Sequence, residues 1–100
     1  AADPAPNEQM RLTEQALEQA RAVGANAEDI TELKQAEDKV ARASAEMTEG
    51  SYKDARMLAE QAELDARLAE ARVLTLKSQE QLNVLNTRIT RLRKQLAEAQ

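Results

Sequence analysis

The chain has 100 residues, enough for one small domain, of which 42% are hydrophobic, and it carries a formal net charge of −4. One tyrosine without phenylalanine or tryptophan excludes an aromatic core, and the lack of cysteine and histidine excludes thiol chemistry, disulfides and almost every zinc site. No stretch approaches the ~20 apolar residues that a membrane span needs, while the abundance of Ala, Glu, Gln, Leu and Arg is typical of long helices.

The first expected element is a helix over residues 7–23. The Pro/Ala stretch before it, residues 1–6, is predicted to be disordered and is typical of a mature chain from which an upstream signal has been removed. Asn7 or Asp3 is placed to cap this helix, and apolar residues then recur at helical spacing. Gly24 follows the last of them, where helices commonly stop.

The second expected helix covers residues 27–49. Asn26 precedes it and Asp29 follows three residues later, a weak capping box. Apolar residues then step by three and four until Gly50 ends the run. Both loops are short, which favours antiparallel neighbours in a helical bundle.

The third helix is predicted to be continuous, because residues 51–100 contain neither glycine nor proline. At 1.5 Å per residue this segment is about 75 Å long. Its first apolar stripe, here called the inner seam, is mostly alanine, and we predict that it forms the bundle core with helices one and two. Leu58, Leu64 and Leu68 flank this seam and are expected to widen the buried stripe. The inner seam consists of Tyr52, Ala55, Ala59, Ala62, Ala66, Ala69, Val73 and Leu76.

A second stripe, here called the arm seam, follows on a different face of the third helix. Helices one and two, about 25 and 35 Å long, are too short to cover the third beyond roughly Leu74. Burial of the arm seam's five large aliphatic side chains, at about 2 kcal/mol each, would stabilise the protein by roughly 10 kcal/mol. A monomer does not gain this stabilisation. Such a stripe usually indicates an interface. The arm seam consists of Leu82, Leu85, Ile89, Leu92 and Leu96.

The expected fold is therefore all-α, an antiparallel three-helix bundle with a long third helix. Residues 7–76 would form the bundle, with helices at about 7–23, 27–49 and 51–76. Residues 77–100 would continue the third helix as a protruding, amphipathic, coiled-coil-like arm. We call these two parts the bundle and the arm.

The arm carries a basic patch, and no acidic residue occurs between positions 81 and 97. Bases near a helix C-terminus also complement the helix dipole, which is the simpler interpretation. Nucleic-acid binding would need aromatic residues for base stacking, and none is nearby. A basic amphipathic helix end can also lie on a membrane surface. The patch consists of Arg88, Arg91, Arg93 and Lys94.

Several partners fit the arm seam. With Leu82 at heptad position a, a parallel copy of the chain would set Arg88 against Arg93, a like-charge pair that gives no specificity. An antiparallel pair, a trimer or an acidic partner stays open, as does a different protein or an adjacent domain. A third helix folded back on itself would need a break within 77–81 or 83–87, and neither segment has glycine or proline.

No enzymatic, cofactor or metal site is predicted. Glu60, Glu63 and Glu70 share the third helix, but a di-metal bundle site would want Glu-x-x-His motifs, and the chain has no histidine. We interpret these acids as a solvated face with ion pairs such as that of Glu63 with Arg67. The serines have no base to activate them for nucleophilic chemistry.

The segment from Gly50 to Arg72 resembles an alanine-rich helical domain of unknown function found in bacterial envelope lipoproteins. Its members share a G-x-Y-x-x-A-x-x-x-A-E-x-A core followed by a D-A-R-L-A-E-A run. Residues 6–10 and 33–43 fit the family's first two helices loosely. The core positions that match are Gly50, Tyr52, Ala55, Ala59, Glu60 and Ala62.

In that family the domain usually follows a lipoprotein signal and often precedes an OmpA-like peptidoglycan-binding domain. The 100 residues contain neither the lipidated cysteine nor such a domain. The resemblance implies a periplasmic location, with membrane attachment only through an upstream lipid anchor, and brings no catalytic residue.

We therefore interpret the chain as a non-enzymatic structural or interaction module of the cell envelope, which forms a homo-oligomer or binds another envelope protein. The alternative is a carrier for a hydrophobic or lipid-like ligand held within an opened bundle.

Overall fold

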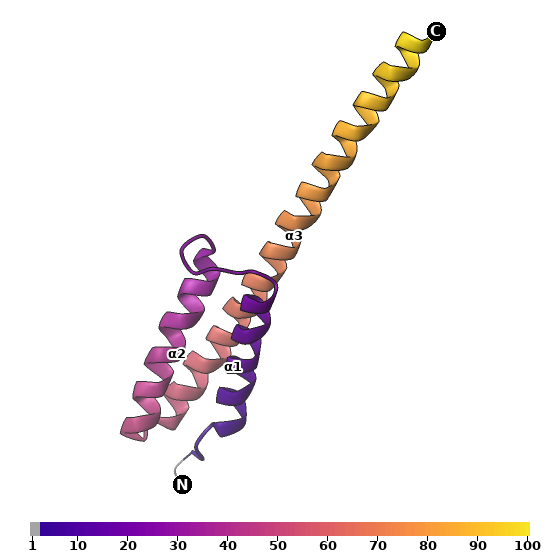
Figure 1. Cartoon of the computed structure of the whole chain (residues 1–100). Coiled ribbons are helices and arrows are strands. Elements are labelled where there is room, and N and C mark those ends of the chain that lie inside the picture. Colours follow the sequence, from indigo (N-terminus) through magenta and orange to yellow (C-terminus); the bar gives the residue numbers. More distant parts are fainter. Residues whose placement is uncertain (1–2) are drawn as a thin grey trace.

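The computed structural model describes residues 3–100, which form three helices and no strand: α1 (Asn7–Ala22), α2 (Thr31–Glu49) and α3 (Tyr52–Ala99). α2 runs opposite to α1 and α3, and the second half of α3 continues alone beyond the other two helices (Figure 1). The molecule is accordingly elongated, with extents of 81, 21 and 16 Å. The predicted all-α bundle with a long third helix is confirmed.

The chain before α1 is more ordered than predicted. Residues 1 and 2, part of the segment expected to be disordered, lie outside the described residues. Asp3 to Pro6 has no regular secondary structure, yet Pro6 is buried. Pro6 also accepts the first helical bond through its carbonyl, from Met10 N at 3.0 Å. Neither Asn7 nor Asp3 caps α1, because Pro6 occupies the capping position without a side-chain bond.

Glycines end α1 and α2 as expected. Gly24 adopts a positive φ of 104° just beyond α1, and the N–H of Ala25 then bonds the carbonyl of Ala20 at 3.0 Å. Gly50 has a φ of 78°, and the N–H of Ser51 bonds the carbonyl of Glu46 at 2.9 Å. A residue with a Cβ would be strained at either position, which explains why glycine ends both helices.

α2 begins at Thr31, later than the predicted residue 27. Asn26 does accept a bond from the N–H of Glu28 through its side chain, at 2.9 Å. That bond starts a separate turn, which closes when Ile30 N bonds the carbonyl of Asn26 at 2.8 Å. Ile30 is extended, with φ −111° and ψ 104°, and its side chain is buried. The extended residue separates the turn from α2 and moves an apolar side chain into the core.

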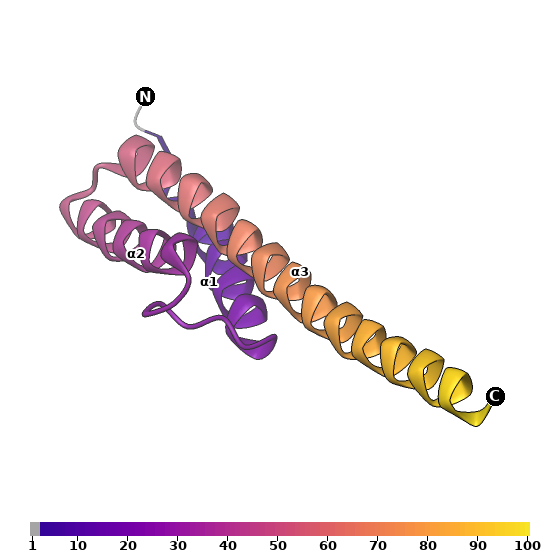
Figure 2. The same ribbon diagram turned by 90° about the horizontal axis from the view of Figure 1, so that it is seen from above.

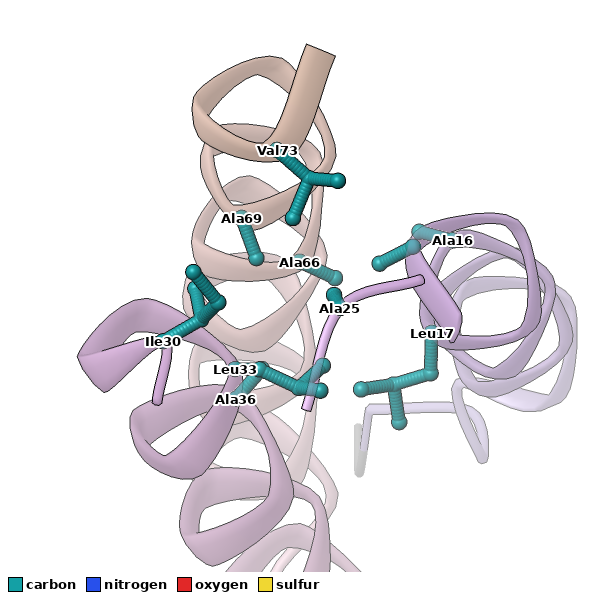
Figure 3. Packing of buried hydrophobic residues seen from close by; sticks show 10 residues of the cluster. Ala16, Leu17, Ala25, Ile30, Leu33, Ala36, Ala66, Ala69 and Val73 are labelled. Carbon is teal, nitrogen blue, oxygen red and sulfur yellow. The ribbon is translucent and has the colours of Figure 1, made fainter. Parts of the chain in front are cut away.

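The core forms where α1 and α2 pack closely against the alanines of α3. Six inner-seam residues, from Ala55 to Val73, are buried. Leu17 from α1 and Leu33 from α2 point toward each other beside the α3 alanines (Figure 3). Each of these two leucines is almost fully buried, which is worth about 2 kcal/mol per side chain. α1 and α2 also bury four alanines of their own, so small residues allow close approach on all three helices: Ala16, Ala20, Ala36 and Ala43.

The buried face of α3 is narrower and shorter than predicted. Tyr52 is only half-buried at the first residue of α3, and Leu76 is 51% exposed. Leu64 and Leu68, expected to widen the buried stripe, are also exposed. Only two helices cover α3, both on one side of it (Figure 2), so residues on its opposite side stay in solvent. Leu76 lies beside the α1–α2 loop, where it lines an open hollow together with Ile30.

Polar side chains connect the helices around this core. The fully buried Thr13 places its hydroxyl oxygen 2.8 Å from the carbonyl oxygen of Ala59, which joins α1 to α3. Lys39 of α2 bonds Asp65 of α3 at 2.7 Å. The Thr13 hydroxyl also lies 2.9 Å from the carbonyl oxygen of Gln9 in its own helix, so the contact with Ala59 adds to a bond that α1 provides by itself.

Candidate interaction surface

The exposed large apolar side chains are concentrated on one helix. Among residues 3–100 there are eleven, and all of them lie on α3. Single exposed leucines are normal on protein surfaces, whereas the confinement of all eleven to one helix sets that helix apart as the candidate interaction surface. The eleven are Met57, Leu64, Leu68, Leu74, Leu76, Leu82, Val84, Leu85, Ile89, Leu92 and Leu96.

All five residues of the arm seam are among them, with exposed fractions from 37% to 66%. α3 is one uninterrupted helix through this region, so neither 77–81 nor 83–87 contains the break that a folded-back arm would need. Every residue from Leu74 to Gln100 is exposed. The fold-back alternative is therefore wrong for this structure, and the arm seam faces solvent along its whole length (Figure 1).

The arm seam continues into the bundle on the outer side of α3. Counting back in sevens from Leu82 reaches Thr75 and Leu68, and counting back from Leu85 reaches Ser78, Ala71, Leu64 and Met57. This extension was not predicted, because Leu64 and Leu68 flank the inner seam in the sequence and were expected beside the core. Extending the heptad count upstream of Leu82 would have found it. We call the complete set the outer stripe: Met57, Leu64, Leu68, Ala71, Leu82, Leu85, Ile89, Leu92 and Leu96.

Charge is separated between the two parts of the molecule. Residues 77–100 carry five bases and two acids, a net +3. Residues 1–76 carry nine bases and sixteen acids, a net −7, and together these give the −4 of the whole chain. Within residues 3–100, the ion pairs all join side chains at or before Arg72. The predicted basic patch, Arg88, Arg91, Arg93 and Lys94, is thus exposed on the arm beside the arm seam.

The predicted acidic face has the ion pair that was expected. Arg67 donates to Glu63 at 2.8 Å, and Gln9 of α1 donates to the same carboxylate at 2.9 Å. The bond from Gln9, with that from Arg67, holds the pKa of Glu63 below its usual value. Likewise, the bonds from Arg72 lower the pKa of Glu32 on α2. These carboxylates are engaged in holding helices together, which is a structural use of the acidic residues.

A hollow of about 480 Å³ lies where the α1–α2 loop meets the start of the arm. Ile30, Val73 and Leu76 supply apolar walls, while Asp29 and Lys77 are among the charged residues that line it. Lys77 Nζ also donates to the carbonyl of Val23 at 2.5 Å, which fastens the first turn of the arm to the loop. The hollow lies beside the loop and not within the alanine-lined core, where the carrier hypothesis would place a ligand.

Across residues 3–100, no three acidic side chains come together in a way that could hold a metal ion. Over the same residues, none of the helices combines the length and the apolar character required to cross a bilayer.

Comparison with known proteins found two matches. The sequence model of a family described as a domain of unknown function (DUF4398) matches residues 8–85. The crystal structure of a DUF4398 family protein from Pseudomonas aeruginosa PAO1 is similar at 66% sequence identity, over 97% of this chain and 100% of that chain, with a TM-score of 0.92. Because only 3% of this chain is left outside, the structural similarity includes the arm. No curated protein matches the chain.

Proposed function

This chain belongs to the DUF4398 family, whose function is unknown, and we propose that it is a non-enzymatic interaction module whose bundle presents the arm to a protein partner. The exposure of the arm seam carries this proposal: five large apolar side chains on one helix, each at least 37% exposed. Because these side chains are on average about half exposed, burying them would recover about 5 kcal/mol before the costs of association.

Within residues 3–100 of the monomer, no packing stabilises the arm as a lone helix in water. From Lys77 to Ala99 it spans about 35 Å. Most helical stability in proteins comes from packing an apolar face, and across the described residues the arm continues α3 without such packing in the monomer. A partner on the arm seam would supply that packing. The basic patch beside it favours a partner surface that is acidic.

We also propose a place in the bacterial cell envelope, either free in the periplasm or held at the outer membrane by an upstream lipid anchor. The resemblance of residues 50–72 to envelope lipoprotein domains supports this location. Fractionation of cells that produce the full gene product should recover it with periplasmic or outer-membrane markers. Recovery with cytosolic markers would contradict the envelope assignment.

Sedimentation equilibrium at two concentrations tests the interaction itself. We expect the unmodified protein to exceed its monomer mass of 11.1 kDa as its concentration rises. The double variant Leu85→Glu with Leu92→Glu should return to the monomer mass, because charges would enter the arm seam. Its circular dichroism should still show a helical bundle.

A matched control carries the same two charges on another face of the arm. Asn83→Glu with Thr90→Glu has the same seven-residue spacing, and both positions are exposed and outside the arm seam. This variant should associate like the unmodified protein. A monomer mass for all three proteins at every concentration would refute self-association and leave a different protein as the partner.

A further inference from the structure

The outer stripe is longer than the arm, and this length indicates what covers it. Leu64 and Leu68 lie in the bundle half of α3, yet they are 60% and 48% exposed and share a heptad register with the arm seam. A partner that covered the arm alone would leave them in solvent. The covering molecule must therefore reach from the arm along the outer side of the bundle.

We propose that a second copy of this chain covers the outer stripe from Leu64 to Leu96, with the two α3 helices antiparallel and each arm lying along the bundle half of its partner's α3. The inference rests on the self-association form of the proposed function and adds the orientation and the contacting residues. Figure 2 shows why the surface is accessible: α1 and α2 both lie on one side of α3, and its other side is uncovered.

Charge selects the antiparallel arrangement. A parallel pair would bring two arms of net +3 together and two bundles of net −7 together, since residues 77–100 and 1–76 carry these charges. It would also set Arg88 against the partner's Arg93. An antiparallel pair places each positive arm on a negative bundle, twice in one dimer. Complementary charge of this kind steers association and penalises the wrong orientation.

The same reasoning selects a register. With the two-fold axis near residue 80, Leu92 faces the partner's Leu68 and Leu96 faces the partner's Leu64. Arg93 then lies beside the partner's Asp65. A shift of one heptad toward the bundle would set Arg88 against the partner's Arg67, and contact between the arms alone would set Arg88 against the partner's Arg88. The proposed register has no such like-charge pair.

The residues that interrupt the outer stripe also fit this register. Thr75 and Ser78 occupy heptad positions where the stripe lacks a large apolar residue. In the proposed dimer they face the partner's Leu85 and Leu82, so that a small side chain meets a large one in each layer. Large residues then meet at both ends of the contact, and small polar residues meet leucines near the axis.

The length of the contact is sufficient for a specific dimer. Residues 64–96 span about 48 Å, and a helix is about 10 Å wide. A strip of that size buries on the order of 500 Å² per copy, or about 1,000 Å² in total, which is the smallest area expected of a biological interface. Contact between the arms alone would be about half as long and would fall below it.

Disulfide cross-linking tests the orientation, and the chain offers a clean background because it has no cysteine. Leu68→Cys and Leu92→Cys would each be oxidised alone and after mixing in equal amounts under reducing conditions. We expect a cross-linked dimer only in the mixture, in about one half of the dimers, because random mixing forms that share of mixed pairs. Neither variant alone should cross-link, since the antiparallel register separates identical positions.

A control and a second pair complete the experiment. Leu76→Cys is also on an exposed leucine of α3 but outside the outer stripe, so its mixture with Leu92→Cys should not cross-link. If Leu68→Cys weakens association, Leu64→Cys mixed with Leu96→Cys reports on the same register. Sedimentation of each variant under reducing conditions shows whether the dimer is retained.

The outcomes separate the two proposals. Cross-linking of each variant alone would indicate a parallel pair and overturn the proposed orientation. A dimeric mass without a link in either mixture would overturn this inference while leaving self-association through the arm intact. A monomeric mass for the unmodified protein would overturn this inference together with self-association, and would leave a different protein as the partner of the arm.

Discussion

Glu63 lies at the edge of the contact between α1 and α3, where one carboxylate receives bonds from two helices. Gln9 Nε2 donates to it at 2.9 Å from α1, and Arg67 donates from the next turn of α3. These bonds favour the charged form, which is why the pKa of Glu63 lies below its usual value of 4.5. A carboxylate whose pKa is lowered on folding makes stability depend on pH.

Lowering the pH should weaken the bundle through Glu63. Its contribution is fully present above the unfolded pKa of 4.5 and is lost as the pH falls through the lower folded pKa. Glu63→Gln should therefore be less stable than the unmodified protein at pH 7, by up to about 1 kcal/mol. The difference should be smaller at about pH 3, because the charged carboxylate is lost as the pH falls through the folded pKa. Urea unfolding followed by circular dichroism at both pH values measures it.

The control for this prediction is Glu60→Gln, an exposed position on the same helix. Its unfolding free energy should differ from that of the unmodified protein by less than about 0.5 kcal/mol at both pH values. A Glu63→Gln variant as stable as the unmodified protein at pH 7 would show that the bonds from Gln9 and Arg67 contribute nothing to folding.

At the scale of elements, α3 carries two different apolar surfaces, the inner seam and the outer stripe. Its inner seam allows α1 and α2 to approach closely because five of the six buried residues are alanine. The outer stripe presents larger side chains on the opposite side. The helix as a whole consequently shows no single apolar face, although each of these two surfaces is clearly apolar. This is typical of a helix that contacts different neighbours on different sides.

A larger residue in the inner seam should damage the bundle. Ala66 is fully buried between α1 and α2, so Ala66→Leu would force the helices apart. We expect a loss of about 1–3 kcal/mol in the free energy of unfolding, measured by urea titration. Ala41→Leu on the exposed side of α2 adds the same side chain in solvent and should change stability by less than about 0.5 kcal/mol. Equal effects at both positions would contradict the close-packed seam.

For the whole molecule, the core and the arm are separable. The last buried residue is Val73, and all later residues are exposed. The bond of Lys77 to the α1–α2 loop is the last contact between the arm and the other helices among the hydrogen bonds of residues 3–100. The bundle thus contains the apolar contacts that the monomer needs in order to fold.

A chain of residues 1–78 should therefore fold without the arm. It retains the core and the Lys77 contact, so we expect cooperative thermal unfolding by circular dichroism and a monomer mass by sedimentation. Loss of helical signal in this shortened chain would show that the arm stabilises the bundle, and a dimeric mass would show that residues after 78 are not needed for association.

The sequence by itself determined the features that depend on near neighbours in the chain. Gly24 and Gly50 ended two helices because each position needs a positive φ, and the absence of glycine and proline after Gly50 kept α3 continuous. The spacing of the alanines predicted the inner seam. The lengths of the first two helices predicted where the arm begins.

Only the tertiary structure decided how much of α3 is covered. Leucines such as Leu64 and Leu68 are usually buried in a core. They are exposed here because both other helices lie on one side of α3. The later start of α2 has a similar cause, because burial of Ile30 holds that residue extended where local capping favoured a helix. Burial depends on where distant segments pack, so the apolar pattern along α3 could not show which of its two sides the bundle would leave uncovered.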